Sequence, residues 1–242
     1  MPFPTIRLAS RPLHFFYLCD GSGSMASQGK IQALNQAIRQ SLPAMATVAR
    51  QNPEARVLVR AVRFADRAVW HLPAPTPVED LAWSDLEAGG ITAMGEALRL
   101  VAAELRSPPM EARALPPVLV LISDGQPTDD FDGGLAVLMR EPWAQKAVRL
   151  AIAMGHDADL EVLQSFIGPD VRGQEDAARR PLQASNAACL AQYIEWASTA
   201  VVGAASRPAS RVGVESTGVN VPLPDLPPTV LDPIDDVGPL VW

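Results

Sequence analysis

The chain has 242 residues, of which 48% are hydrophobic and 19% charged, and its formal net charge is −7. This length suits one α/β domain of roughly 200 residues, long enough to bury a full core, with room for one appendage. The acidic balance argues against nucleic acid and anionic membrane surfaces as partners, and the longest apolar stretches fall well short of the ~20 residues that span a bilayer.

The N-terminus and the cysteines indicate an intracellular protein. Residues 1–12 carry arginines and prolines but lack the continuous apolar segment of a secretory signal. The two cysteines, Cys19 and Cys189, make neither a disulfide framework nor a zinc site, so we expect two reduced, packed thiols. The predicted location is the cytoplasm.

The first part of the chain alternates between strand and helix patterns. Residues 14–19 form a short apolar run that ends at Asp20, which is typical of a buried parallel strand. From about residue 28, apolar residues at three-to-four spacing predict a helix, which Pro43 should kink or split. Residues 56–64 alternate apolar and basic side chains, which predicts a strand with one wetter face.

The alternation continues to about residue 203, with a short strand over 68–72 expected at an edge of the sheet. The later predicted elements are helices over 94–105, 134–140, 158–167 and 186–202, the last capped by Ser185 or Asn186, and strands over 117–123, 148–154 and 181–184. This pattern predicts an α/β fold with a doubly wound, mostly parallel six-stranded sheet covered on both faces. Such sheets bind ligands at the carboxyl ends of their strands, where the strand order reverses.

Composition changes near residue 203. Residues 204–242 contain seven prolines and five acidic residues against two arginines, and they lack helical periodicity. We therefore expect an N-terminal extension (1–12), one domain (13–203) and a disordered or extended, Pro-rich acidic tail (204–242) that makes no contact with the core. Valines and leucines recur along this tail, so both a linker and a docking peptide stay open.

Three oxygen-rich loops lie next to the predicted elements. The run DGSGS (20–24) follows the first strand, GGIT (89–92) precedes the helix over 94–105, and SDGQPTDD (123–130) ends the strand over 117–123. They offer hydroxyl and carboxylate oxygens with no cysteine or histidine beside them, which favours Mg²⁺, Mn²⁺ or Ca²⁺ over zinc or copper. We expect these loops to be exposed.

Together the loops resemble the metal-ion-dependent adhesion site (MIDAS) of von Willebrand factor A (vWA) domains. DGSGS fits the D-x-S-x-S motif of that family, Thr92 its separate threonine and Asp124 its distal aspartate, in the order the family uses. The runs SDGQPTDD, GGITAMGEAL and EWAST are similar, more narrowly, to the TerY-like bacterial group of tellurite-resistance and stress-associated gene clusters. The resemblance covers residues 13 to about 203 and implies a vWA, Rossmann-like fold.

The resemblance also implies one divalent metal, Mg²⁺ or else Mn²⁺ or Ca²⁺. Its implied ligands are the hydroxyls of Ser22, Ser24 and Thr92, with Asp20 and Asp124 bound directly or through water. Neutral hydroxyls leave the ion electrophilic, so an Asp or Glu of a partner protein would complete its shell. The implied function is non-catalytic, metal-dependent protein–protein interaction.

The TerY-like similarity implies a role in bacterial stress signalling. The chain would be a scaffold or phosphorylated substrate that works with a Ser/Thr kinase and a metal-dependent phosphatase. Thr217 and Thr229 in the tail are the expected phosphorylation sites, because they lie in stretches without predicted structure.

Other interpretations stay open. The loops could be only turns and helix caps, with Thr92, Thr128, Asp129 and Asp130 as capping residues.

The competing function is a haloacid-dehalogenase-type phosphatase, for which Asp20 is in place, although Ser22 stands where a second aspartate belongs. Spacing argues against a P-loop and a nucleophile elbow, and His14, His71 and His156 are too scattered for a zinc hydrolase. A surface adhesin is disfavoured by the missing export signal.

Overall fold

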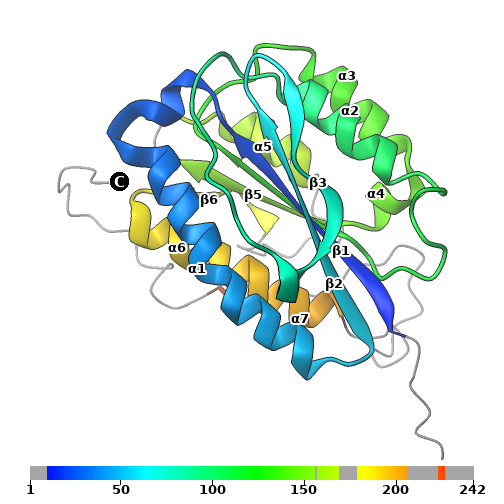
Figure 1. Ribbon diagram of the computed structural model, residues 1–242. Coiled ribbons are helices and arrows are strands. Elements are labelled where there is room, and N and C mark those ends of the chain that lie inside the picture. Colours follow the sequence, from blue (N-terminus) through cyan, green and yellow to red (C-terminus); the bar gives the residue numbers. More distant parts are fainter. Residues whose placement is uncertain (1–9, 156, 169–178, 207–222, 227–242) are drawn as a thin grey trace, which may run out of the picture.

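A six-stranded sheet forms the centre of the computed structural model, which describes residues 10–155, 157–168, 179–206 and 223–226 (Figure 1). The strand order is β3-β2-β1-β4-β5-β6, with β3 antiparallel to β2 and all other pairs parallel. The strands are β1 (Arg11–Asp20), β2 (Ala55–Phe64), β3 (Ala68–Pro77), β4 (Val118–Ser123), β5 (Val148–Met154) and β6 (Leu182–Ala184). The predicted α/β fold with a mostly parallel six-stranded sheet is confirmed.

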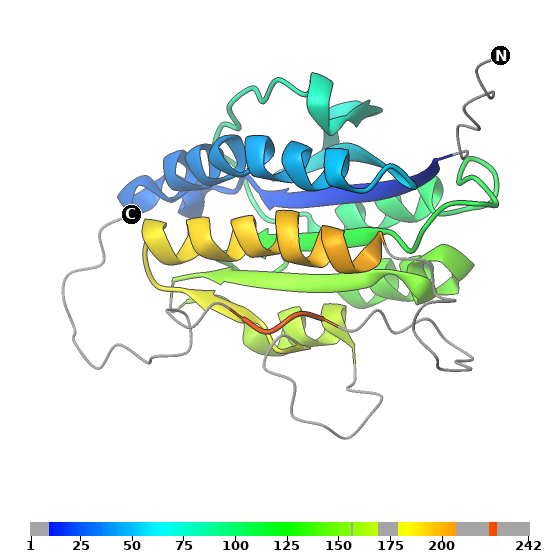
Figure 2. The ribbon, with the colours of Figure 1, turned by 90° about the horizontal axis from the view of Figure 1, so that it is seen from below.

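Helices cover both faces of this sheet (Figures 1 and 2). On one face lie α1 (Lys30–Gln51), α6 (Ala187–Trp196) and α7 (Val202–Ala205); on the other lie α2 (Met94–Glu104), α3 (Phe131–Arg140), α4 (Pro142–Lys146) and α5 (Leu160–Ile167). Short turns of other helix types are η1 (Gly23–Gly29), η2 (Val78–Asp80) and η4 (Ala197–Val201). Within the described ranges, none of the helices has the length and apolar character that a membrane crossing needs.

The alternation of side chains along β1 explains why two helical layers are needed. Phe15 and Tyr17 face the layer of α1 and α6, whereas Phe16 and Leu18 face the layer of α2 and α3. Successive side chains of a strand point to opposite faces of the sheet, so an unbroken apolar run demands cover on both. Each face accordingly has its own hydrophobic core.

The helix that follows the first strand is not split at Pro43. It runs as the single element α1 from Lys30 to Gln51, so of the kink or split expected there the split is wrong. Proline removes one backbone hydrogen bond from a helix. The buried side chains before and after it, among them Ile38 and Met45, belong to the same core, and their burial outweighs the missing bond.

The second strand also differs from its prediction. Of its basic residues Arg56 is exposed and Arg63 half-buried, but the central Arg60 is only 9% exposed, so the strand has no continuous wet face. The Arg60 guanidinium forms an ion pair with Glu104, donates to the carbonyl of Pro73 and lies 4.6 Å from the ring centroid of Trp70. The predicted edge strand is longer than expected and extends to Pro77, because an edge strand tolerates the missing N–H groups of prolines.

The chain reverses direction across the sheet between β1 and β4. From β1 it moves to β2 and β3 on one side, and from β4 it moves to β5 and β6 on the other. The carboxyl ends of these two parallel neighbours therefore open side by side at the point where the strand order reverses. Asp20 ends β1 and Asp124 follows β4 at this point.

The start of the predicted tail contacts the core, so the expectation of no contact is wrong. Helix α7 extends to Ala205, and both Ala205 and Ser206 are buried. Residues 223–226 form neither helix nor strand and lie against the domain: Leu223 and Leu226 pack on the core that α1 and α6 share, and the indole of Trp196 donates to the carbonyl of Asp225 at 3.1 Å. Residues 223–226 therefore bind to the domain of their own chain.

The contact between residues 223–226 and the domain should contribute measurably to the stability of the protein. Leu223→Ala combined with Leu226→Ala should lower the free energy of unfolding by about 1–2 kcal/mol, because both side chains are partly buried. Urea denaturation monitored by circular dichroism measures the change. Leu160→Ala is the matched control, since that leucine is already 39% exposed and its truncation should have a smaller effect. Equal effects would mean that the segment does not dock.

Candidate metal site

Asp20 lies at the very end of β1 and is fully buried, so its expected exposure is wrong. Its Oδ1 accepts a hydrogen bond from the backbone N–H of Ser22 at 2.8 Å. Its Oδ2 accepts one from the hydroxyl of Ser123, the last residue of β4, at 2.5 Å. One carboxylate thus joins the ends of two neighbouring strands.

The hydroxyls of the first loop continue from this carboxylate to a second one. The Oγ atoms of Ser22 and Ser24 share a hydrogen bond of 2.9 Å. Ser24 Oγ donates to Oδ1 of Asp124 at 2.7 Å. Ser22 and Asp124 are almost completely buried, whereas Ser24 is exposed. Asp20, Ser22, Ser24 and Asp124 therefore form one continuous polar set that opens to solvent at Ser24.

Thr92 reaches the same place from the loop before α2. Its backbone N–H donates to Thr128 Oγ1 at 3.0 Å, and its carbonyl accepts from the Thr128 N–H at 2.9 Å. Its hydroxyl points towards Gly125: a Cβ added there would lie 3.7 Å from Thr92 Oγ1 and 3.9 Å from Ser24 Oγ. The structure thus brings all five predicted ligands to one edge of the sheet.

Backbone hydrogen bonds tie the loops to one another. The N–H of Gly23 donates to the carbonyl of Gly90 at 2.9 Å, and the N–H of Gly89 donates to the carbonyl of Gly21 at 2.8 Å. Gly90 has a φ of 86°, a left-handed conformation that glycine adopts without strain. The positions of the hydroxyls consequently depend on the loop backbones and not on side-chain packing alone.

The two carboxylates differ in how their charge is balanced. Asp124 Oδ2 accepts a hydrogen bond from the ammonium of Lys30 at 2.7 Å, and both side chains are buried. Asp20 forms no ion pair with any described residue. Burial raises the pKa of Asp20, hydrogen bonds from Ser123 and Ser22 lower it, and the neighbouring charge of Asp124 raises it further. Among the buried groups at this edge, negative charge exceeds positive charge by one.

Sequence reasoning missed two members of this set. The pattern places Ser123 only at the end of a strand, yet its hydroxyl donates a hydrogen bond to Asp20 Oδ2. Lys30 was not singled out, although its position carried a signal: a cation in the first turn of a helix is unfavourable unless an anion pairs with it.

The alternative capping roles apply to other residues of the third loop. Asp129 accepts hydrogen bonds from the backbone N–H groups of Gly95 and Glu96 at the start of α2. Asp130 caps α3 by accepting from the N–H of Gly133. These two aspartates serve the helices, as predicted, and are separate from the hydroxyl set.

The histidines stay dispersed in the described part of the chain. His14 is buried in β1, and its Nε2 lies 2.8 Å from Glu111 Oε2. His71 of β3 forms hydrogen bonds with Ser84. His156 lies outside the described residues, as do Thr217 and Thr229. The described part therefore places no histidine beside Asp20.

The residues present fit a hard divalent cation. The Thr92 hydroxyl is buried but makes no hydrogen bond with any described residue, and Asp20 is a buried carboxylate without a counter-ion. No three His, Cys, Asp or Glu side chains gather in the described part, so a cation here would depend on hydroxyl oxygens as well. Oxygen-only donors of this kind suit Mg²⁺, Mn²⁺ or Ca²⁺.

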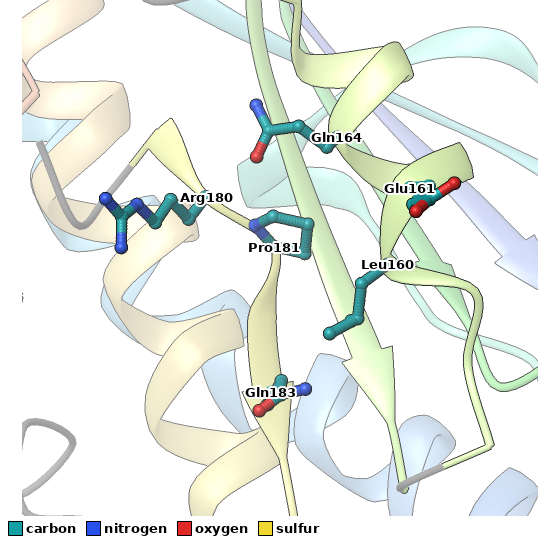
Figure 3. Close-up of a pocket in the computed structure, with 6 residues that line it drawn as sticks. All are labelled: Leu160, Glu161, Gln164, Arg180, Pro181 and Gln183. Atoms are coloured by element: carbon teal, nitrogen blue, oxygen red, sulfur yellow. The ribbon is translucent and has the colours of Figure 1, made fainter. Parts of the chain in front are cut away.

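A shallow pocket lies elsewhere, between α5 and β6 (Figure 3). It is lined by Leu160, Glu161, Gln164, Arg180, Pro181 and Gln183. In Figure 3 the charged ends of Glu161 and Arg180 point in opposite directions, so they do not converge on a ligand. None of the sequence-predicted site residues contributes to it.

No protein-family model and no curated protein matches the sequence. Solved structures do match. The pilus adhesin SpaC from Lactobacillus rhamnosus GG has a TM-score of 0.59 at 12% identity over 78% of this chain and 30% of its own. A von Willebrand factor type A protein from Catenulispora acidiphila has a TM-score of 0.53 at 18% identity, covering 79% of this chain and 43% of its own.

A third match is proximal thread matrix protein 1 from the mussel byssus, solved with a zinc-occupied MIDAS motif. Its TM-score is 0.56 at 14% identity, over 78% of this chain and 47% of its own. The chain thus spans less than half the length of these three proteins. At such low identity the likeness concerns the fold, and the chain has the α/β fold of a vWA domain.

Proposed function

We propose that the chain is a non-catalytic, metal-dependent protein–protein interaction module. Asp20, Ser22, Ser24, Thr92 and Asp124 would hold Mg²⁺, or else Mn²⁺ or Ca²⁺. The observation that carries this proposal is the continuous polar set from Asp20 to Asp124, with the unbonded Thr92 hydroxyl beside it. When bound, the cation would supply a positive charge that an Asp or Glu of a partner protein can bind.

The environment of Asp20 favours binding over phosphatase chemistry. Both oxygens of this carboxylate accept hydrogen bonds from Ser22 and Ser123, and the side chain is fully buried, so it is poorly placed to attack a substrate. The position two residues later holds Ser22, which cannot act as a carboxylic acid. These features support an interaction module, and the phosphatase alternative is not favoured.

One exposed side chain next to the site suggests what a partner offers besides its carboxylate. Ile91 directly precedes Thr92 and is 54% exposed, although it is a large apolar residue. Apolar contacts that surround a charged anchor exclude water from it and strengthen binding. We therefore expect an apolar residue next to the Asp or Glu of the partner.

The cellular role rests on the resemblance to TerY-like proteins. On that basis the module works in the bacterial cytoplasm as a scaffold or phosphorylated substrate, with a Ser/Thr kinase and a metal-dependent phosphatase as partners and Thr217 and Thr229 as modified residues. The cysteines support a reducing compartment: both are free, and burial raises the pKa of the Cys19 thiol, which keeps it protonated and unreactive.

The unequal charge balance of the two aspartates predicts opposite effects on the metal-free protein. Asp20→Asn should raise the free energy of unfolding by about 1 kcal/mol, since it removes a buried charge that lacks a counter-ion. Asp124→Asn should lower it by roughly 3 kcal/mol, because the buried Lys30 ammonium loses its partner. Urea denaturation in EDTA measures both. Effects of the same sign would contradict the described charge balance.

Metal binding is tested by calorimetry with Mg²⁺, Mn²⁺, Ca²⁺ and Zn²⁺. Zinc is included because the structurally similar mussel protein was solved with zinc in its MIDAS motif. The wild-type chain should bind at least one ion, and Asp20→Asn should lose that binding while staying folded. Asp129→Asn is the matched control, because this carboxylate lies close in sequence to Asp124 but caps α2. Loss of binding in the control alone would place the metal elsewhere.

Partner binding is tested by capture from a bacterial lysate with the full chain as bait. A specific partner should bind in Mg²⁺ or Mn²⁺, be released by EDTA and return when the ion is restored. Asp20→Asn bait should fail to capture it, and Ile91→Ser bait should bind it about tenfold more weakly, as expected for the loss of a central apolar contact. Capture that is indifferent to EDTA would exclude this edge as the docking surface.

A further inference from the structure

Lys30 occupies an unusual position for a lysine. It is the first residue of α1, and its side chain is 8% exposed. The ammonium lies against the end of β5, where a Cβ added to Gly155 would be 3.4 Å from Nζ. A cation at a helix N-terminus is repelled by the helix dipole, so its contact with Asp124 must offset both burial and this repulsion.

The two oxygens of Asp124 serve different partners. Oδ1 accepts from Ser24, which belongs to the predicted ligand set, whereas Oδ2 accepts from Lys30. The lysine therefore fixes the carboxylate from one side and leaves the other oxygen facing the hydroxyls. The charge of Lys30 also acts on the site directly, because its ammonium forms an ion pair with Asp124, a predicted metal ligand.

The three buried charged groups set the net charge inside the site. Asp20 and Asp124 contribute two negative charges and Lys30 one positive charge, which leaves a net charge of −1. With a divalent cation added, the total becomes +1. Without the lysine, the same cation would give a neutral site with no net attraction for a carboxylate.

We propose that Lys30 is a positioning residue that couples metal binding to binding of an acidic ligand. This inference rests on the proposed function. Lys30 weakens the affinity for the cation alone and strengthens the affinity of the cation-loaded site for a carboxylate. Each of the two ligands then raises the affinity for the other by the same factor, as linkage requires.

The test uses Mn²⁺ titrated into the full chain by calorimetry, in sodium chloride and in sodium acetate of equal ionic strength. Acetate is the probe for a partner carboxylate. In the wild-type chain Mn²⁺ should bind several-fold more tightly in acetate. In Lys30→Met the affinity in chloride should rise about tenfold, the order expected for removing a nearby positive charge, and the acetate effect should vanish.

Two further variants isolate the charge. Lys30→Arg keeps it and should retain the acetate effect. Lys30→Gln loses it but keeps an N–H donor towards Asp124, so the result does not depend on a methionine being tolerated beside that carboxylate. Lys30→Gln should therefore behave like Lys30→Met in both media. Asp20→Asn controls for Mn²⁺ bound elsewhere on the chain.

The outcomes separate this inference from the proposed function. If Lys30 only supports the structure, its removal weakens Mn²⁺ binding in both media, and the inference is overturned. It is also overturned if acetate has no effect on the wild-type chain, or if the neutral variants keep that effect. If the wild-type chain binds no divalent ion in either medium, the proposed function itself fails.

Discussion

The burial of two carboxylates at one edge of the sheet is the constraint on which the site depends. Asp20 and Asp124 repel each other in surroundings from which water is largely excluded, and the protein supplies only one buried ammonium between them. The remaining charge is stabilised by hydrogen bonds from Ser22, Ser24 and Ser123. These donors come from the loop after β1 and from the end of β4, and the ammonium comes from the start of α1, so all of these elements must be correctly placed at once.

The register of the sheet supplies most of that placement. Cys19 lies opposite Ile122 in the parallel pair of β1 and β4, so the next residues, Asp20 and Ser123, stand side by side and bond. A shift by one residue would turn Asp20 to the opposite face and carry the neighbouring apolar side chains out of their cores. The two hydrophobic layers thereby fix the position of the polar site.

Periodicity, a local property, predicted the strands and their order along the chain. The five residues that meet at the carboxyl edge came from the resemblance of the three loops to vWA domains, because loop chemistry alone left turns and helix caps open. Local patterns could not predict what depends on distant packing. The burial of Asp20 follows from the loops folding over it, and the continuity of α1 through Pro43 follows from the core beneath that helix. The partner of Lys30 is 94 residues away, beyond the reach of any local pattern.

Charge left unbalanced by the protein is what lets such a site respond to a cation. A second buried lysine beside Asp20 would satisfy the fold and remove the reason for a metal to bind, whereas the loss of Lys30 would leave a site that a metal alone could neutralise. The single ammonium on Asp124 lies between these extremes. It stabilises the metal-free fold at one carboxylate and leaves the other, Asp20, uncompensated. Under the proposed function, the same three side chains would set folding stability, cation affinity and the sign of the charge offered to a partner, so a change in one of these properties would alter the others.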